Sequence, residues 1–121
     1  TSLIPVYMKT QFAKDPVFAQ TKMVYSIYNS TFEGKLNKNF LKIALIGEDV
    51  KEKDLSVFKD LTNDALTLGG VQYADAVVQG SADMPGLAAL KKAIGKKPFL
   101  AYQEEDNLLQ NYADFYKMLL Q

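Results

Sequence analysis

Residues 74–83 read Ala74-Asp75-Ala76-Val77-Val78-Gln79-Gly80-Ser81-Ala82-Asp83, and this stretch decides the fold. Its apolar run predicts a strand over 76–79 that is covered on both faces, because a strand with one wet face alternates apolar and polar residues. Gly80 and the polar residues after it predict a loop. The apolar spacing that follows then predicts a helix that begins at Pro85 and ends at Gly95. Strand, loop and helix in this order begin a βαβ unit, from which parallel sheets are built.

Two other segments have the character of this strand. Val24–Tyr28 is apolar and aromatic, and Phe99–Tyr102 is entered through a proline. Helical spacing predicts helices over 2–13, 61–73 and 104–120. The segment 40–46 fits a helix turn or a short strand, and 49–60 fits a loop with one helical piece around Leu55 and Phe58. The pair Gly69-Gly70 inside a helix is typical of close packing. The pattern therefore predicts an α/β fold with three parallel strands in one sheet and helices on both faces.

The composition of the chain excludes several classes of partner and of catalytic site. The chain has 121 residues, which fits a single domain over 1–121, and 14 acidic and 14 basic side chains. This balance argues against a nucleic acid or an anionic membrane as partner, since both select for basic excess. His, Cys, Arg and Trp are absent. Their absence excludes Ser-His and Cys-His nucleophile pairs, zinc sites of imidazole or thiolate, and guanidinium clamps on phosphate.

We expect no metal site and no resident cofactor. No apolar run is long enough to span a bilayer, and no signal peptide is visible at the start. Together with the lack of cysteine, this favours a cytoplasmic protein. The first residues lie inside an apolar periodic segment and lack an initiator Met, which indicates a fragment of a longer protein.

Three polar segments, 28–31, 79–83 and 102–105, follow the three predicted strands. Ligands of open α/β sheets bind beyond the carboxyl ends of the strands, so these segments predict a binding rim. The alternative interpretation is that such loops are polar only because they lie at the surface.

Individual features of these loops also permit two interpretations. The loop Gly80–Asp83 is a candidate anion cradle, but it lacks phosphate-loop spacing, which favours helix capping by Ser81 or Asp83. Glu104-Glu105-Asp106 offers candidate acid/base carboxylates, but adjacent residues on a helix do not face each other, which favours a solvated helix N-terminus. The apolar stripe that follows is more typical of core packing than of a partner-binding face.

Several stretches share a pattern with one known family. Pro5-Val6-Tyr7-Met8-Lys9 is followed by Asp15-Pro16-Val17-Phe18, by KMVYSIYN over 22–29, by Phe32-Glu33-Gly34 and by GVQYADAVVQGS over 70–81. Together they resemble the bacterial glycogen and starch synthases (glycosyltransferase family 5), whose segments read PVYLK, DPFF, AKVVFTIHN, YQG and GIVYADRVTTVSP. The segment 98–103 and the helix after it look like short glycogen-synthase-like proteins of the Bacteroidetes type.

The resemblance implies a Rossmann-like, three-layer α/β/α fold, as the C-terminal part of the N-terminal domain of a two-domain GT-B glycosyltransferase. Such enzymes transfer glucose from ADP-glucose or UDP-glucose to the end of an α-1,4-glucan, with retention of configuration and without a metal. A nucleotide sugar and an α-1,4-glucan are the implied partners. The resemblance implies no oligomeric state.

The resemblance also supplies candidate site residues. The family's His, which contacts the region of the transferred sugar, corresponds to Tyr28, and the next residue is retained as Asn29. Gly34 ends the loop that follows, and Ser81 follows the second strand. We expect Tyr28, Asn29, Gly34 and Ser81 to face sugar. Tyrosine stacks and donates a hydrogen bond, but it does not titrate near neutral pH as histidine does.

Three hypotheses of function follow. The first is a piece of a glycogen or starch synthase that is inactive by itself, because a GT-B site needs groups from both domains. The alternative is a catalytically degenerate relative that binds glucan or a partner, which the tyrosine at position 28 favours. A regulatory α/β module such as a phosphorelay receiver is the third, but Asp75 lies at the start of its predicted strand instead of its end.

Overall fold

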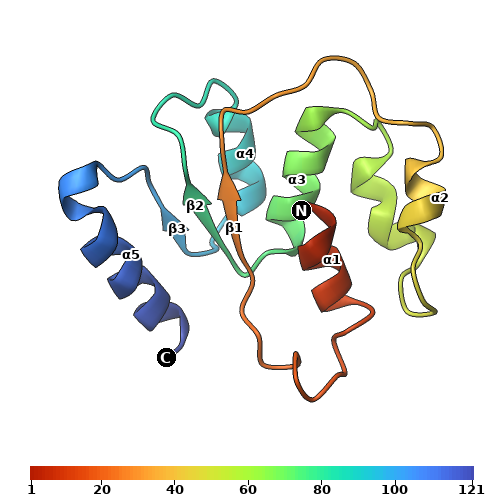
Figure 1. Ribbon diagram of the computed structural model, residues 1–121, viewed down its shortest axis with the longest axis horizontal. Helices are drawn as coiled ribbons and strands as arrows, with labels where there is room; N and C mark the ends of the chain where they lie inside the picture. The colour runs from red at the N-terminus through yellow and green to blue at the C-terminus, as the bar shows by residue number, and fades with distance from the viewer.

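The computed structural model describes all 121 residues, which form five α-helices, one 3-10 helix and three strands (Figure 1). In chain order these are α1 (Leu3–Lys9), β1 (Val24–Ile27), α2 (Phe40–Ala44), the 3-10 helix η1 (Glu52–Phe58), α3 (Asn63–Tyr73), β2 (Ala76–Gln79), α4 (Leu87–Ile94), β3 (Phe99–Leu100) and α5 (Glu105–Leu119). Every predicted strand and helix is present, most with tighter bounds.

The three strands form one parallel sheet in the order β1-β2-β3, which confirms the predicted topology. Val24 pairs with Ala76, and Val77 pairs with Phe99. The predicted third strand is too long. After Leu100 the chain no longer pairs with the β2 backbone. Instead, the Tyr102 amide donates a hydrogen bond to the Gln79 side chain.

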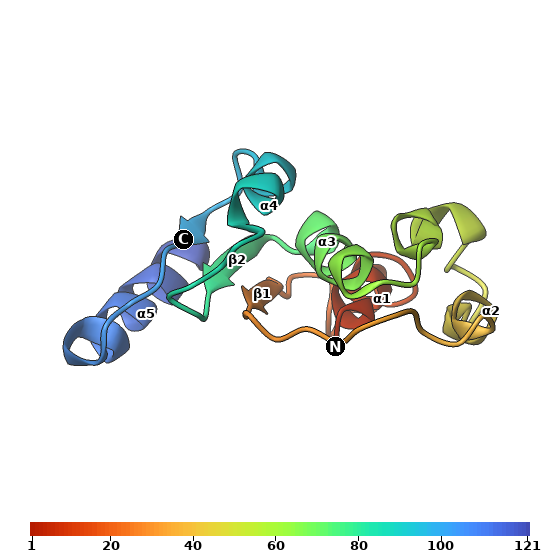
Figure 2. The ribbon, with the colours of Figure 1, turned by 90° about the horizontal axis from the view of Figure 1, so that it is seen from above.

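Helices cover both faces of the sheet, as predicted. One face packs against α3 and α4 in a cluster of Ile27, Val71, Val77 and Ile94. The other face packs against α5 in a cluster of Ala76, Val78 and Phe115. Alternate residues of a strand point to opposite faces, so β2 feeds both clusters. Figure 2 shows α4 and α5 on opposite sides of β2. The architecture is a three-layer, Rossmann-like α/β arrangement.

A second core lies beside the sheet, where α1, α2, η1 and α3 meet (Figure 1). Its buried members are Val6, Ala44, Val50, Leu55 and Phe58. The ambiguous segment 39–60 supplies most of them, as two short helices. Gly69 and Gly70 are the predicted close contacts: a Cβ would lie 2.1 Å from the Phe58 ring and 2.4 Å from the Tyr25 ring, respectively.

Three local expectations need correction. Leu61 lies outside α3 because its φ is +57°, and the helix is instead capped by Thr62, whose hydroxyl accepts from an amide of the first turn. Pro85 precedes α4, whose N-cap is Gly86. The apolar stripe of α5 is core only in part, since Phe115 is buried while Leu109 is 83% exposed. No helix is long and apolar enough to cross a membrane.

Candidate functional site

The three polar segments meet at the carboxyl edge of the sheet. The Asn29 amide donates to Ser81 Oγ over 2.9 Å, which joins the first two segments. Gln79 Nε2 donates to the Ser81 carbonyl over 2.9 Å, and Gln79 Oε1 accepts from the Tyr102 amide over 3.4 Å. Gln79 is almost fully buried, and its amide group connects the second and third segments, while Ser81 connects the first. The rim is therefore a bonded unit.

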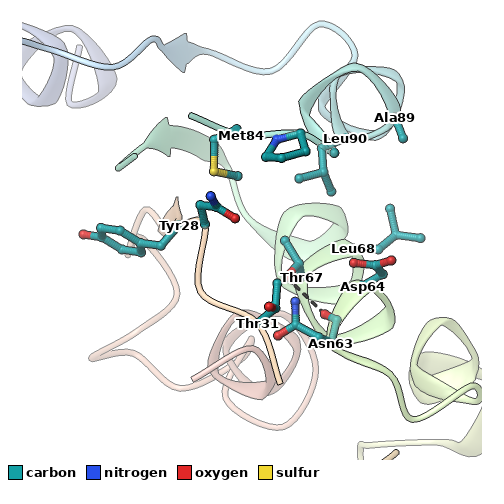
Figure 3. A pocket seen from close by; sticks show the side chains of 12 residues that line it. Tyr28, Thr31, Asn63, Asp64, Thr67, Leu68, Met84, Ala89 and Leu90 are labelled. Carbon is teal, nitrogen blue, oxygen red and sulfur yellow. Dashed lines mark hydrogen bonds between the residues drawn. The ribbon is translucent and has the colours of Figure 1, made fainter. Parts of the chain in front are cut away.

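A cleft of about 270 Å³ opens beside this rim on the α3–α4 side of the sheet. Its walls come from the loop after β1, the first two turns of α3 and the start of α4; they are Tyr28, Asn29, Thr31, Asn63, Asp64, Thr67, Leu68, Met84, Pro85, Gly86, Ala89 and Leu90. Figure 3 shows Thr31, Asn63 and Thr67 grouped on one side and Met84 with Leu90 on the other. One wall is thus polar and the opposite wall apolar.

The chemistry of this lining suits an uncharged polar ligand. Asp64 is the one acidic side chain in the walls, and they contain no lysine. Hydroxyl and amide groups on one wall match the hydroxyls of a sugar, while the methionine, proline and leucine opposite match its C–H face. No group of three acidic residues converges anywhere in the chain to hold a metal ion.

Shifted pKa values lie away from the cleft. At the amino end of β2, burial would raise the pKa of Asp75, but hydrogen bonds from Lys9 and from the Met23 amide, with the charges of Lys9 and Lys22, lower it overall. Lys9 Nζ contacts both carboxylate oxygens, at 2.7 and 2.8 Å. Asp75 thus ties α1 to β1 at the edge opposite the rim, the wrong edge for a phosphorelay aspartate.

Lys97 lies at the same amino edge of the sheet. Its Nζ donates to the carbonyls of Val71 and Gln72 at 2.7 and 2.6 Å, so it caps the last turn of α3. Burial is the main cause of the lowered pKa of Lys97; the charge of Asp75 opposes this shift, and that of Lys9 adds to it. Both ionic groups with shifted pKa values therefore connect elements of the fold.

Comparison with known proteins identifies the family of the chain. Residues 1–85 match the family described as "Starch synthase catalytic domain". The chain belongs to this family. Glycogen synthase of Photobacterium profundum is 34% identical over 77 residues, and that of Pseudothermotoga lettingae is 32% identical over 77; each match covers 64% of this chain and 15% of the relative. Glycogen synthase of Vibrio vulnificus is 47% identical over 34 residues, 28% of this chain and 7% of the relative. No solved structure matches significantly.

The chain therefore spans about 15% of the length of these curated relatives. The matched residues of the starch synthase catalytic domain include the whole polar wall of the cleft and end at Pro85, inside the apolar wall. Gly86, Ala89 and Leu90 complete the cleft from beyond the match, and α5 lies entirely outside it.

The four candidate site residues occupy different places around the cleft. Tyr28 and Asn29 line it. Ser81 does not line it, but it holds the Asn29 backbone in place through its hydroxyl. Gly34 has a φ of +80° with open space around it, and it is not part of the walls. The structure therefore brings three of the four together.

The Tyr28 ring points away from the other lining residues (Figure 3). Ile27 faces α3 and α4, so the alternation of β1 sends the next side chain to the α5 face. There the ring lies over Gly80, where an added Cβ would be 2.3 Å from it. The Tyr28 ring thus faces a second surface, on the α5 side of the sheet.

The predicted role of Ser81 or Asp83 as a helix cap is wrong. Gly86 is the N-cap of α4, and no side chain bonds to that end. The Ser81 hydroxyl is used by Asn29 instead. Glu104, Glu105 and Asp106 are exposed at the start of α5, as predicted for a solvated helix N-terminus.

Sequence reasoning missed the α3 wall of the cleft, Asn63, Asp64 and Thr67. The rule that ligands bind at strand ends names only the loops that leave strands. However, a helix that leads into a parallel strand runs antiparallel to it, so its N-terminus reaches the same edge of the sheet. The polar start of α3, Thr62-Asn63-Asp64, was the available signal.

Proposed function

We propose that the chain is the C-terminal part of the Rossmann-like N-terminal domain of a GT-B glycosyltransferase of the glycogen and starch synthase type. The observation that carries the proposal is the family match over 1–85, which contains the polar wall of a cleft at the carboxyl edge of the sheet. The proposed reaction is transfer of glucose from ADP-glucose or UDP-glucose to an α-1,4-glucan, with retention and without a metal.

In this proposal the cleft holds a glucosyl unit of the glucan. Asn63, Thr67 and Thr31 provide hydrogen-bonding groups for the sugar hydroxyls, and Met84 with Leu90 covers the C–H face. Asn29 also lines the cleft, and the hydrogen bond from its backbone amide to Ser81 Oγ holds it in place. These residues bind and orient the sugar, and the nucleotide contacts come from the second domain of a GT-B enzyme.

Binding tests the cleft directly. Titration of the labelled protein with maltose should shift NMR signals of Asn29, Thr31 and Thr67 first. Asn63→Ala should weaken binding about threefold to tenfold, the equivalent of one lost hydrogen bond. Lys92→Ala is the matched control, because this residue lies on the exposed part of α4 and outside the cleft. An unchanged affinity for Asn63→Ala, or no shift at millimolar maltose, would contradict the proposed site.

An activity assay tests whether this chain alone catalyses the proposed transfer. The purified chain should transfer no glucose to glycogen from either nucleotide sugar, because it contains neither Arg nor His and the GT-B site needs two domains. Turnover above a control without protein would overturn this expectation.

The alternative function is a glucan-binding relative that has lost catalysis. Tyr28 favours it, because tyrosine stands at the family's histidine position and its ring faces away from the cleft. The full reading frame would distinguish the two functions. A Lys-x-Gly-Gly-Leu segment upstream and a nucleotide-binding domain downstream would support the enzyme, and their absence would support the binding protein.

A further inference from the structure

Three tyrosines gather on the α5 face of the sheet, outside the cleft. Tyr112 and Tyr116 lie one helical turn apart on α5, with ring centroids 5.9 Å apart in an edge-to-face arrangement. Tyr28 reaches the same face over Gly80. Tyr112 packs on the cluster of Ala76, Val78 and Phe115, which also receives Val24 of β1. We call Tyr28, Tyr112 and Tyr116 the tyrosine surface.

In the tyrosine surface, one partly buried tyrosine lies beside two exposed ones. Burial raises the pKa of the Tyr112 phenol, and the neighbouring phenols of Tyr28 and Tyr116 raise it further, so the three hydroxyls lie in one neighbourhood. Tyr28 is 57% exposed and Tyr116 is 41% exposed, whereas Tyr112 is half-buried between them. The rings of Tyr28 and Tyr116 are therefore accessible to a ligand, whereas Tyr112 packs against the protein.

The chemistry of these side chains selects the class of ligand. Tyrosine presents a flat apolar ring, which stacks on the C–H face of a pyranose, and a hydroxyl that bonds to sugar hydroxyls. An uncharged, repeating ligand with alternating C–H faces and hydroxyls, such as a linear glucan, fits both properties.

Tyr28 connects this surface to the cleft. It is one of the cleft's lining residues, while its ring lies over Gly80 on the opposite face of the sheet. A glucan chain that leaves the cleft beside Tyr28 therefore reaches the tyrosine surface.

We infer that the tyrosine surface is an extended glucan-binding site, in which the Tyr28 and Tyr116 rings stack on sugar units beyond the one held in the cleft. This inference rests on the proposed function, since it adds further sugar units to the same ligand. It predicts that the tyrosine surface contributes to the binding of long oligosaccharides and contributes nothing to the binding of short ones.

Tyr116→Ala tests the inference, because this side chain is accessible and its loss leaves the buried Phe115 in place. Its affinity for maltoheptaose, measured by calorimetry, should fall about twofold to tenfold, the range for one aromatic contact. Its affinity for maltose should stay at the wild-type value. Tyr116→Phe should keep most of the maltoheptaose affinity, since it retains the ring. Met118→Ala is the matched control, because Met118 is an exposed apolar residue of the same helix that lies two positions after Tyr116 and so faces away from it.

The possible outcomes distinguish the extended site from the cleft and from a protein-binding surface. If Tyr116→Ala binds maltoheptaose like the wild type while Asn63→Ala binds it weakly, the extended site is wrong and the cleft stands. If the wild type binds neither sugar, the proposed function fails first. If Leu109→Ala abolishes a concentration-dependent self-association and Tyr116→Ala leaves glucan affinity unchanged, the surface serves a protein partner and the inference is overturned.

Discussion

Replacing Gly69 with Ala sets two effects of opposite sign against each other in α3. In an exposed helix interior the change stabilises by about 1 kcal/mol, because glycine loses more conformational entropy on folding. Here the new methyl carbon would lie 2.1 Å from the Phe58 ring. Ordinary carbon contacts are about 3.5–4.0 Å, so the ring must move by more than about 1 Å.

Phe58 has little room for that movement, because it is fully buried in the cluster that contains Val6, Ala44 and Leu55. Overpacking of such a core costs about 1–3 kcal/mol. The close contact places Gly69→Ala toward the upper end of that range, so after the helical gain we expect the free energy of unfolding to fall by about 1–2 kcal/mol. With an m-value of about 2 kcal/mol/M, the urea midpoint should fall by roughly 0.5–1 M.

Gly86→Ala is the matched control for this experiment. Its backbone φ is −86° and nothing lies within 4 Å of the position of a Cβ. Its urea midpoint should therefore fall only by the equivalent of about 0.5 kcal/mol, because alanine is a weaker N-cap than glycine but meets no packing clash here. Adding Phe58→Leu to Gly69→Ala should recover part of the loss if the clash is the cause. A midpoint for Gly69→Ala at or above the wild-type value would refute the packing argument.

Other changes test contacts elsewhere. Because its pKa is lowered in the fold, Asp75 contributes stability that is complete above its unfolded value of about 3.9 and is lost as the pH falls through the folded pKa; Asp75→Asn should flatten this slope in urea titrations at pH 2–5. Tyr7→Phe should lower unfolding stability by about 1 kcal/mol, since the Ala44 carbonyl loses a 2.7 Å hydrogen bond; an unchanged denaturation midpoint would mean that water replaces it. Thr62→Ala should remove about 1 kcal/mol at the start of α3, whereas Thr62→Ser should not, as thermal unfolding would show.

The parallel sheet was predictable because its signal is local. The apolar run of β2 required cover on both faces, and both clusters beside it meet that requirement. The helices within 39–60 were not predictable in the same way, since their pattern is short. Their form depends on burying Ala44 and Phe58 against Val6, which is distant in sequence.

The candidate site was predictable at its rim and not in its walls. Tyr28 and Asn29 follow a strand, so the strand-end rule finds them. The direction of the Tyr28 ring was also available, because a buried Ile27 sends its neighbour to the other face. The α5 stripe was misjudged because a helix over a narrow sheet buries fewer residues than its apolar face offers, as Leu109 demonstrates.

The spacing of the paired strands sets an order in which the sheet assembles. Val77 pairs with Phe99, 22 positions away, whereas Val24 pairs with Ala76, 52 positions away. Closing the longer loop costs about 0.8 kcal/mol more chain entropy, because the cost grows with the logarithm of loop length. From loop length we therefore expect the β2–α4–β3 unit to form before β1 joins it. The carboxyl rim, which needs the Asn29–Ser81 hydrogen bond, is then among the last parts to form and among the first to open.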